Sequence, residues 1–183
     1  MNSQFTRLKN PRTETYLQFK QFVLGSDFPW YWNPKATPDD VDTQEYQDVP
    51  FYSHVFLARP RWKSMSDMLY PQQQSALLDN LYPVLDEIVA YNNLPVQSFM
   101  RINANCVHPQ TDTRDTIPHT DHQFEHQNLI IYFSDSGGPT IAFNNEWKEY
   151  HHPQEDDIVT FTGTHFMNPP KIHRRVIVVA TYI

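Results

Sequence analysis

Apolar residues recur at helical spacing in two segments of the first half of the chain. In Gln72–Asn92 they lie three or four positions apart, which predicts a helix with one buried face. Pro83 lies within this segment, so we expect the helix to bend or break there. Thr15–Leu24 has a weaker helical pattern that ends at Gly25. We therefore expect two helices before residue 95, with proline-rich connections whose aromatic residues mostly pack in the core.

From Val96 onwards the pattern changes to short apolar runs rich in β-branched and aromatic residues. Such runs, separated by turn residues, are typical of antiparallel barrels and jelly rolls. We expect one domain, residues 1–183, in which a helical and proline-rich bracing region (residues 1–95) supports a β core (residues 96–183). The runs are SFMRINANCV (98–107), QNLIIYF (127–133), PTIAF (139–143), DIVTFT (157–162) and RRVIVVATYI (174–183).

Composition narrows the class of protein. Hydrophobic residues make up 39% of the 183 residues, enough for one sizeable core. Cys106 is the single cysteine, which excludes an internal disulfide and a cysteine-rich metal site. The longest apolar run, Val176–Ala180, is too short to span a membrane, and the N-terminus has no signal-like segment, so we expect a cytoplasmic protein. The net charge of −7 argues against a nucleic-acid partner.

Two of the nine histidines and one aspartate have the spacing of a metal site. His119 and Asp121 are two residues apart, so on an extended chain their side chains point to the same face. His165 follows after strands that can return the chain to the same place. Two imidazoles and one carboxylate form the ligand set of non-haem Fe(II) oxygenases, which leaves room for a 2-oxo acid and O2. Gly163, one of only four glycines, suggests a constrained backbone beside His165.

A dicarboxylic cosubstrate such as 2-oxoglutarate also needs a cation for its distant carboxylate. Arg175 lies ten residues after His165, at the start of an alternating strand, and its planar guanidinium suits bidentate pairing. Arg174 points to the opposite face, although a register error of one residue would exchange the two. We expect Arg175 to bind the cosubstrate.

Other histidines offer alternative ligands. His173 is a rival for His165, but it lies too close to Arg175 for a turn between ligand and anchor. The segment His-Thr-Asp-His (119–122) resembles part of a metallo-β-lactamase motif, yet that motif needs a histidine where Ile117 stands. We therefore expect His122 and His126 to be surface residues or to support the metal ligands. The remaining expectations are that His54 packs in a strand and that His151 and His152 are exposed.

From about Met100 to Ile183 the sequence resembles the prolyl 4-hydroxylase-like branch of the Fe(II)/2-oxoglutarate-dependent dioxygenases. The resemblance depends on four pieces in the family's order. It departs from the family at Pro139, where an acidic residue is usual, and in the long polar loop His108–Pro118. The matching pieces are PHTD, LIIYFSDSGGPTIAF, DDIVTFTGTHFMNPP and RRVIVVATYI.

This resemblance implies a double-stranded β-helix, which is a distorted, cupin-like jelly roll, braced by N-terminal helices. It implies that Tyr132, and less directly Asn105, contact 2-oxoglutarate. It also implies an enzyme that consumes 2-oxoglutarate and O2, releases succinate and CO2 and hydroxylates its substrate. Because Asp121 fills the position that halide takes in related halogenases, hydroxylation is the expected outcome.

The substrate and the oligomeric state are open at this point. The family favours a prolyl or other peptidyl side chain in a peptide or protein, and the same chemistry on a free amino acid or other small metabolite is the alternative. A third possibility is a catalytically silent jelly-roll domain, because a fold alone does not imply function.

Overall fold

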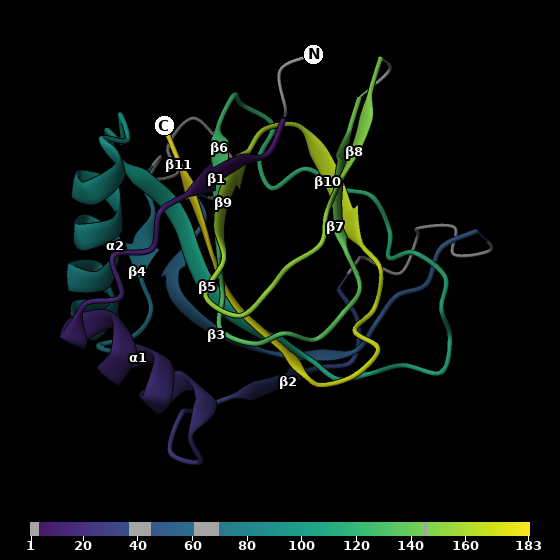
Figure 1. Cartoon of the computed structure of the whole chain (residues 1–183), viewed down its shortest axis with the longest axis horizontal. Coiled ribbons are helices and arrows are strands. Elements are labelled where there is room, and N and C mark those ends of the chain that lie inside the picture. The colour runs from purple at the N-terminus through teal and green to yellow at the C-terminus, as the bar shows by residue number, and fades with distance from the viewer. Residues whose placement is uncertain (1–3, 37–44, 61–69, 145) are drawn as a thin grey trace.

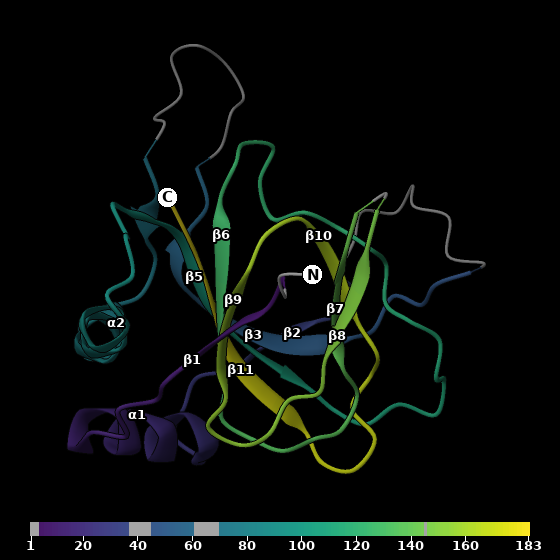
Figure 2. The same cartoon turned by 45° about the horizontal axis from the view of Figure 1, so that its top comes forward.

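The computed structural model describes residues 4–36, 45–60, 70–144 and 146–183. In this part of the chain, strands of two antiparallel sheets face each other, and two helices lie on the outer side of the larger sheet (Figures 1 and 2). This is the double-stranded β-helix with bracing helices that the resemblance implies, so the predicted fold class is confirmed.

The larger sheet contains eight strands, in the order β1-β9-β6-β11-β5-β3-β2, with β4 paired to β3. The smaller sheet has the order β10-β7-β8. The strands of the larger sheet are β1 (Thr6–Leu8), β2 (Tyr31–Asn33), β3 (Phe51–Ala58), β4 (Gln72–Gln73), β5 (Phe99–Val107), β6 (Gln127–Tyr132), β9 (Ile158–Phe161) and β11 (Arg175–Tyr182). Those of the smaller sheet are β7 (Thr140–Phe143), β8 (Lys148–His151) and β10 (Thr164–Met167).

The two helices are α1 (Glu14–Leu24) and α2 (Leu78–Asn92). Thr13 caps α1, because its Oγ1 accepts a hydrogen bond from the backbone N–H of Tyr16 at 3.2 Å. α2 begins at Leu78 and not at Gln72 as predicted, because Gln72 and Gln73 pair with the end of β3. It continues through Pro83, so the predicted break is wrong, and the alternative of a bend stays a prediction.

Alternating residues of the larger sheet serve two different cores. Val176, Val178 and Ala180 of β11 belong to the apolar cluster that includes residues of both helices. Ile177 and Val179, on the opposite face, belong to a second cluster that reaches the smaller sheet. Since side chains alternate along a strand, the same face of β11 also carries Arg175. The inner face of the larger sheet is therefore the wall on which polar groups of a site can stand.

The N-terminal region contributes more than helices. β3 pairs with β5 along most of its length, and β1 pairs with β9 at the far edge of the larger sheet. The expected division at residue 95 therefore does not separate a bracing region from the β core. Within the described ranges, no helix is long and apolar enough to cross a membrane.

Candidate active site

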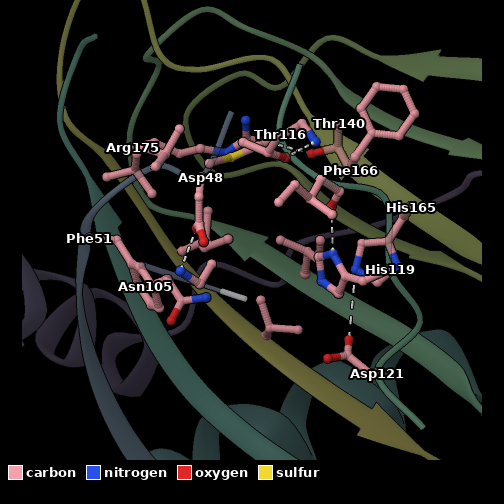
Figure 3. Close-up of a pocket in the computed structure, with 18 of the residues that line it drawn as sticks. Asp48, Phe51, Asn105, Thr116, His119, Asp121, Thr140, His165, Phe166 and Arg175 are labelled. Atoms are coloured by element: carbon pink, nitrogen blue, oxygen red, sulfur yellow. Dashed lines mark hydrogen bonds and ion pairs between the residues drawn. The ribbon is translucent and has the colours of Figure 1, made fainter. Parts of the chain in front are cut away.

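A pocket of about 340 Å³ lies between the two sheets. It brings together residues that are far apart in the sequence, from β5, β10, β11 and the loop before β6 (Figure 3). His119, Asp121, His165, Arg175 and Asn105, all predicted from the sequence, line it. The volume is near the lower end of the range of roughly 300–1,000 Å³ for small-molecule sites.

The two histidines are held in register by the backbone. His119 and His165 form an isolated antiparallel bridge, with reciprocal N–H···O=C hydrogen bonds of 3.0 and 2.9 Å. Their ring centroids are 4.5 Å apart. His119 Nδ1 lies 3.2 Å from the Ile117 carbonyl oxygen, and His165 Nδ1 lies 3.4 Å from that of Gly163. A proton on each Nδ1 can be donated to these carbonyls, which leaves each Nε2 lone pair for a metal.

Burial favours the neutral, metal-binding form of His165. It lowers the pKa of this imidazole from 6.5 to about 4, and the neighbouring His119 acts in the same direction, while Asp121 opposes the shift. Because Gly163 has a φ of +88°, the turn before His165 is one that L residues rarely adopt. The scarce glycine therefore stands where the backbone of the site requires it, as the sequence suggested.

Asp121 is a buried carboxylate with one of its two oxygens satisfied. Its Oδ1 accepts a hydrogen bond from Arg101 Nη1. Burial would raise the pKa of Asp121, but the positive charge of Arg101, with those of the two histidines when protonated, holds it well below its ordinary value. Its Oδ2 is buried without a hydrogen-bond partner and lies 3.7 Å from His165 Nε2. An orphaned carboxylate oxygen beside an imidazole nitrogen fits a cation.

His119, Asp121 and His165 therefore have side chains that suit a metal and lie in one pocket. Their metal-binding atoms, however, do not converge on a single point. Among the described residues, no group of three or more His, Cys, Asp or Glu side chains is arranged as a closed metal site. Asp121 pairs with Arg101 through Oδ1 and lies 3.7 Å from His165 Nε2 through Oδ2. The role of His119, Asp121 and His165 as metal ligands thus stays a prediction.

Arg175 is the most unusual group in the pocket wall. It is 1% exposed, its Nη1 donates to the Gly138 carbonyl at 3.1 Å, and its Nη2 donates to Thr140 Oγ1. Its guanidinium carbon lies 5.3 Å from the centre of the Tyr132 ring. Burial lowers the pKa of Arg175, and no carboxylate among the described residues forms an ion pair with it. A buried cation without a counter-ion is costly, so this position suits an anionic ligand.

Arg174 has a different environment. Its Nη2 donates to the Leu24 carbonyl at 2.6 Å, at the end of α1 on the outer side of the sheet. The register therefore places Arg175 in the pocket and Arg174 outside it, as expected.

Tyr132 and Asn105 differ in their access to the pocket. Tyr132 is fully buried, its hydroxyl lies 2.8 Å from Thr140 Oγ1, and it stands behind the pocket wall and not on its surface. The expected contact between Tyr132 and a cosubstrate thus stays a prediction, and in this structure the ring supports Arg175 and Thr140. Asn105 lines the pocket from β5 and accepts a hydrogen bond from Asn103 Nδ2 at 2.7 Å.

The rival histidines are elsewhere. His173 is exposed and does not line the pocket, which removes it as the alternative to His165. His122 is partly buried and its Nε2 lies 2.7 Å from Thr181 Oγ1.

The other histidines were not candidate ligands. His54 is buried in β3, as predicted. His151, predicted to be exposed, is 3% exposed because β8 turns it onto Tyr132 and Phe5; its neighbour His152 is exposed.

Arg101, Thr140 and Arg59 are among the pocket residues that escaped the sequence analysis. Arg101 was detectable, because it precedes Asn105 by four positions on the same strand and so shares its face. Thr140 lies within a predicted strand, but its contact with Arg175 depends on how the two sheets face each other. Arg59 follows the end of β3, and no pattern in its own segment indicates that it reaches Asp121.

Among the solved structures that share this fold, three that match along 98% of the chain are members or relatives of one enzyme class by their descriptions. An oxidoreductase of the 2OG-Fe(II) oxygenase family from Burkholderia pseudomallei matches with a TM-score of 0.67 and 10% identity, over 84% of its own length. A prolyl hydroxylase from Trichoplax adhaerens, in complex with a peptide fragment of hypoxia inducible factor, matches with a TM-score of 0.59 and 13% identity, over 83% of its length. The non-heme alpha ketoglutarate dependent epimerase SnoN from nogalamycin biosynthesis matches with a TM-score of 0.59 and 10% identity, over 78% of its length.

By sequence, no protein-family model and no curated protein matches the chain. At identities this low, the structural matches show a shared fold, and the activity must be argued from the site itself.

Proposed function

We propose that the chain is an Fe(II)- and 2-oxoglutarate-dependent oxygenase that hydroxylates a C–H bond of its substrate. The observation that carries the proposal is one pocket that holds both halves of the required site. One half is the His119, Asp121 and His165 set with its free Nε2 and Oδ2 atoms. The other is the buried Arg175 guanidinium, with which no carboxylate of the described residues forms an ion pair.

Each residue then has a distinct task. His119 and His165 would offer Nε2 to the metal, because their Nδ1 atoms face backbone carbonyls. Asp121 would add one negative charge, so that the ligands leave the complex cationic enough to attract an anionic cosubstrate. Arg175 would pair with the distant carboxylate of 2-oxoglutarate, with Thr140 beside it as a hydroxyl partner.

Bound Fe(II) would supply the coupling of O2 reduction to decarboxylation of 2-oxoglutarate, which gives succinate and CO2. The chain would supply orientation and exclusion of water. The second apolar cluster, with Ile130, Ile177 and Val179 in the pocket wall, keeps the space between the sheets dry. Hydroxylation is the outcome we propose, as opposed to halogenation, because Asp121 would fill the coordination position that a halide would otherwise take. The ¹⁸O2 experiment described below separates hydroxylation from an epimerisation such as that named for SnoN.

Two classes of substrate are compatible with this proposal. A prolyl or other peptidyl side chain is consistent with the likeness to the Trichoplax prolyl hydroxylase. A small metabolite is favoured by a pocket of about 340 Å³, which 2-oxoglutarate alone would fill in part.

The test starts with binding. Zn(II) occupies such ligand sets without redox chemistry. The protein loaded anaerobically with Zn(II) should bind 2-oxoglutarate, and its Asp121→Ala variant should bind both less tightly. With Fe(II), 2-oxoglutarate and a substrate panel under ¹⁸O2, one labelled oxygen should appear in succinate and one in the product. A protein that binds no 2-oxoglutarate in either metal form would be the silent domain, and a product without label would exclude hydroxylation.

A further inference from the structure

Two arginines from different strands converge on the proposed metal ligand Asp121. Arg101, in β5, donates from Nη1 to Asp121 Oδ1. Arg59, just after β3, donates from Nη1 to the Asp121 backbone carbonyl at 3.0 Å, and its Nη2 lies 3.6 Å from Oδ1. Both arginines line the pocket that holds the histidines and Arg175. Their side chains remain accessible, with exposed fractions of 47% for Arg59 and 22% for Arg101.

The charges at this end of the pocket do not balance. Two guanidinium groups share one carboxylate, and Asp121 is the only acidic side chain among the described residues that pairs with either. The two cations also disfavour each other, since Arg101 contributes, after burial, to a lowered pKa of Arg59. Once Asp121 coordinates a divalent metal, even this counter-charge is shared with the metal.

In the proposed function, 2-oxoglutarate binds to Arg175 and to the metal. Its carboxylates therefore do not neutralise the excess positive charge of Arg59 and Arg101. Its distant carboxylate belongs with Arg175, and its other end belongs on the metal. In Figure 3, Arg175 and Asp121 lie on opposite sides of the two histidines. The arginine pair contacts Asp121 and is partly open to solvent. A second anion is needed there, close to the metal.

We propose that Arg59 and Arg101 bind a carboxylate of the substrate, which makes the substrate a small free acid and not a residue within a peptide. This inference rests on the proposed oxygenase function and specifies its substrate. A guanidinium fork pairs with a carboxylate through two parallel hydrogen bonds, and two forks fix its orientation. Because the pair contacts a metal ligand, the bound carboxylate lies close to the carbon that is oxidised. An internal peptide residue such as proline has no anion at that distance.

The experiment compares acids with their amides, which differ in the carboxylate alone. The probes are L-proline and L-prolinamide, L-leucine and L-leucinamide, and hexanoate and hexanamide. Calorimetry with protein that holds Zn(II) and 2-oxoglutarate measures binding without turnover, and succinate formation with Fe(II) measures turnover. At least one acid should bind about 10- to 100-fold more tightly than its amide, the ratio expected when hydrogen bonds to a charged group are lost.

Variants then assign the preference to the arginines. Arg59→Gln should reduce acid binding about 10- to 100-fold and leave amide and 2-oxoglutarate binding unchanged, whereas Arg59→Lys should retain part of it. Arg12→Gln is the matched control, because Arg12 is exposed, pairs with Asp156 and lies outside the pocket. Arg101→Gln should behave like Arg59→Gln, and its affinity for 2-oxoglutarate reports whether it is folded.

The possible failures are distinguishable. If 2-oxoglutarate does not bind and no succinate forms, the oxygenase proposal itself fails. If 2-oxoglutarate binds normally but no acid binds, or acids and amides bind equally, the carboxylate subsite is wrong. Turnover of a capped prolyl peptide, such as N-acetyl-Gly-Pro-Gly-amide, with full activity in Arg59→Gln would also overturn it and return the substrate to the peptide class.

Discussion

At the scale of single residues, Arg175 illustrates a group whose position is costly without a ligand. Its guanidinium is fully buried, yet its described partners are a carbonyl, a hydroxyl and an aromatic ring. Replacing buried charged groups with apolar residues of similar volume is often neutral or stabilising. The buried position of the Arg175 guanidinium is therefore better explained by a role in binding an anionic ligand than by a contribution to the stability of the fold.

Arg175→Met should therefore separate the two roles. Without 2-oxoglutarate, we expect its Tm to be equal to or above that of the wild type. The affinity of the Zn(II)-loaded protein for 2-oxoglutarate should fall at least about 30-fold, because truncating one partner of a buried charge pair costs about 2 kcal/mol or more. Thermal melts and calorimetry measure the two quantities.

Arg174→Gln provides the control on register. It removes the hydrogen bond to Leu24 and should leave 2-oxoglutarate binding unchanged. If Arg174→Gln loses the cosubstrate and Arg175→Met does not, the roles of the two arginines are reversed. A large loss of Tm in Arg175→Met would show that this residue serves the fold.

The site was predictable where one strand or one loop sets the geometry. His119 and Asp121 lie two positions apart, and Arg175 heads an alternating strand, so local periodicity was enough to place them. Arg59, in contrast, reaches Asp121 across the pairing of β3 with β5, which no local pattern specifies. Burial of Tyr132 behind Thr140 likewise depends on the contact between the two sheets.

At the scale of elements, the five runs predicted from the sequence correspond to β5, β6, β7, β9 and β11, whereas the eight-residue β3 was not among them. β5, β6, β9 and β11 have β-branched apolar runs, because both of their faces are covered. β1, β2, β4, β8 and β10 have two to four residues each and were missed. Such short strands are defined by their pairing partners, as in the pairing of β1 with β9, and carry too few residues for a period of two.

The turn between β6 and β7 offers an element-scale test. Gly138 has a φ of +80°, and an added Cβ would lie 2.7 Å from the Asn168 carbonyl oxygen and would also meet that of Pro169. Gly137 has a φ of +62°, but an added Cβ there would meet only side chains, at 3.6 Å or more. The two glycines thus share the backbone strain and differ in the space around them.

Gly137→Ala should lower the free energy of unfolding by about 1–2 kcal/mol, the cost of the left-handed conformation alone. Gly138→Ala should lower it by more, and it should weaken 2-oxoglutarate binding because the Gly138 carbonyl accepts from Arg175. Urea unfolding and calorimetry measure both effects. Equal losses of unfolding free energy in the two variants would mean that the backbone near Asn168 moves to make room for the added Cβ, which would contradict the expected difference.

At the scale of the whole molecule, buried histidines should make stability depend on pH. Burial lowers the pKa of His151 from 6.5 to about 4, while the carboxylate of Asp157 opposes the shift. Between these two pH values the unfolded chain binds a proton at this residue and the folded chain does not. The free energy of unfolding should therefore fall as the pH falls from about 6.5 to 4.

His151→Phe should reduce this slope by up to about 1.4 kcal/mol per pH unit, because it keeps a ring against Phe5 and Tyr132 but removes the proton site. Urea unfolding of metal-free protein at a series of pH values measures the slope. His152→Phe changes the exposed neighbour and should leave it unaltered. An unchanged slope in His151→Phe would mean that this imidazole is protonated in the folded protein at pH 5.

The position of β11 also governs how the protein can be made. This strand lies between β6 and β5 in the larger sheet, yet it is the last strand along the chain. A ribosome that adds roughly 5–20 residues per second needs about 3–13 s for the 67 residues between β5 and β11. Throughout that interval β5 lacks its partner β11, and β6 lacks it from the time residue 132 has been added, so both can expose an open edge to other nascent chains. The sheet can close only after residue 182 has been synthesised, so the protein folds late, and holding chaperones have their greatest effect in these seconds.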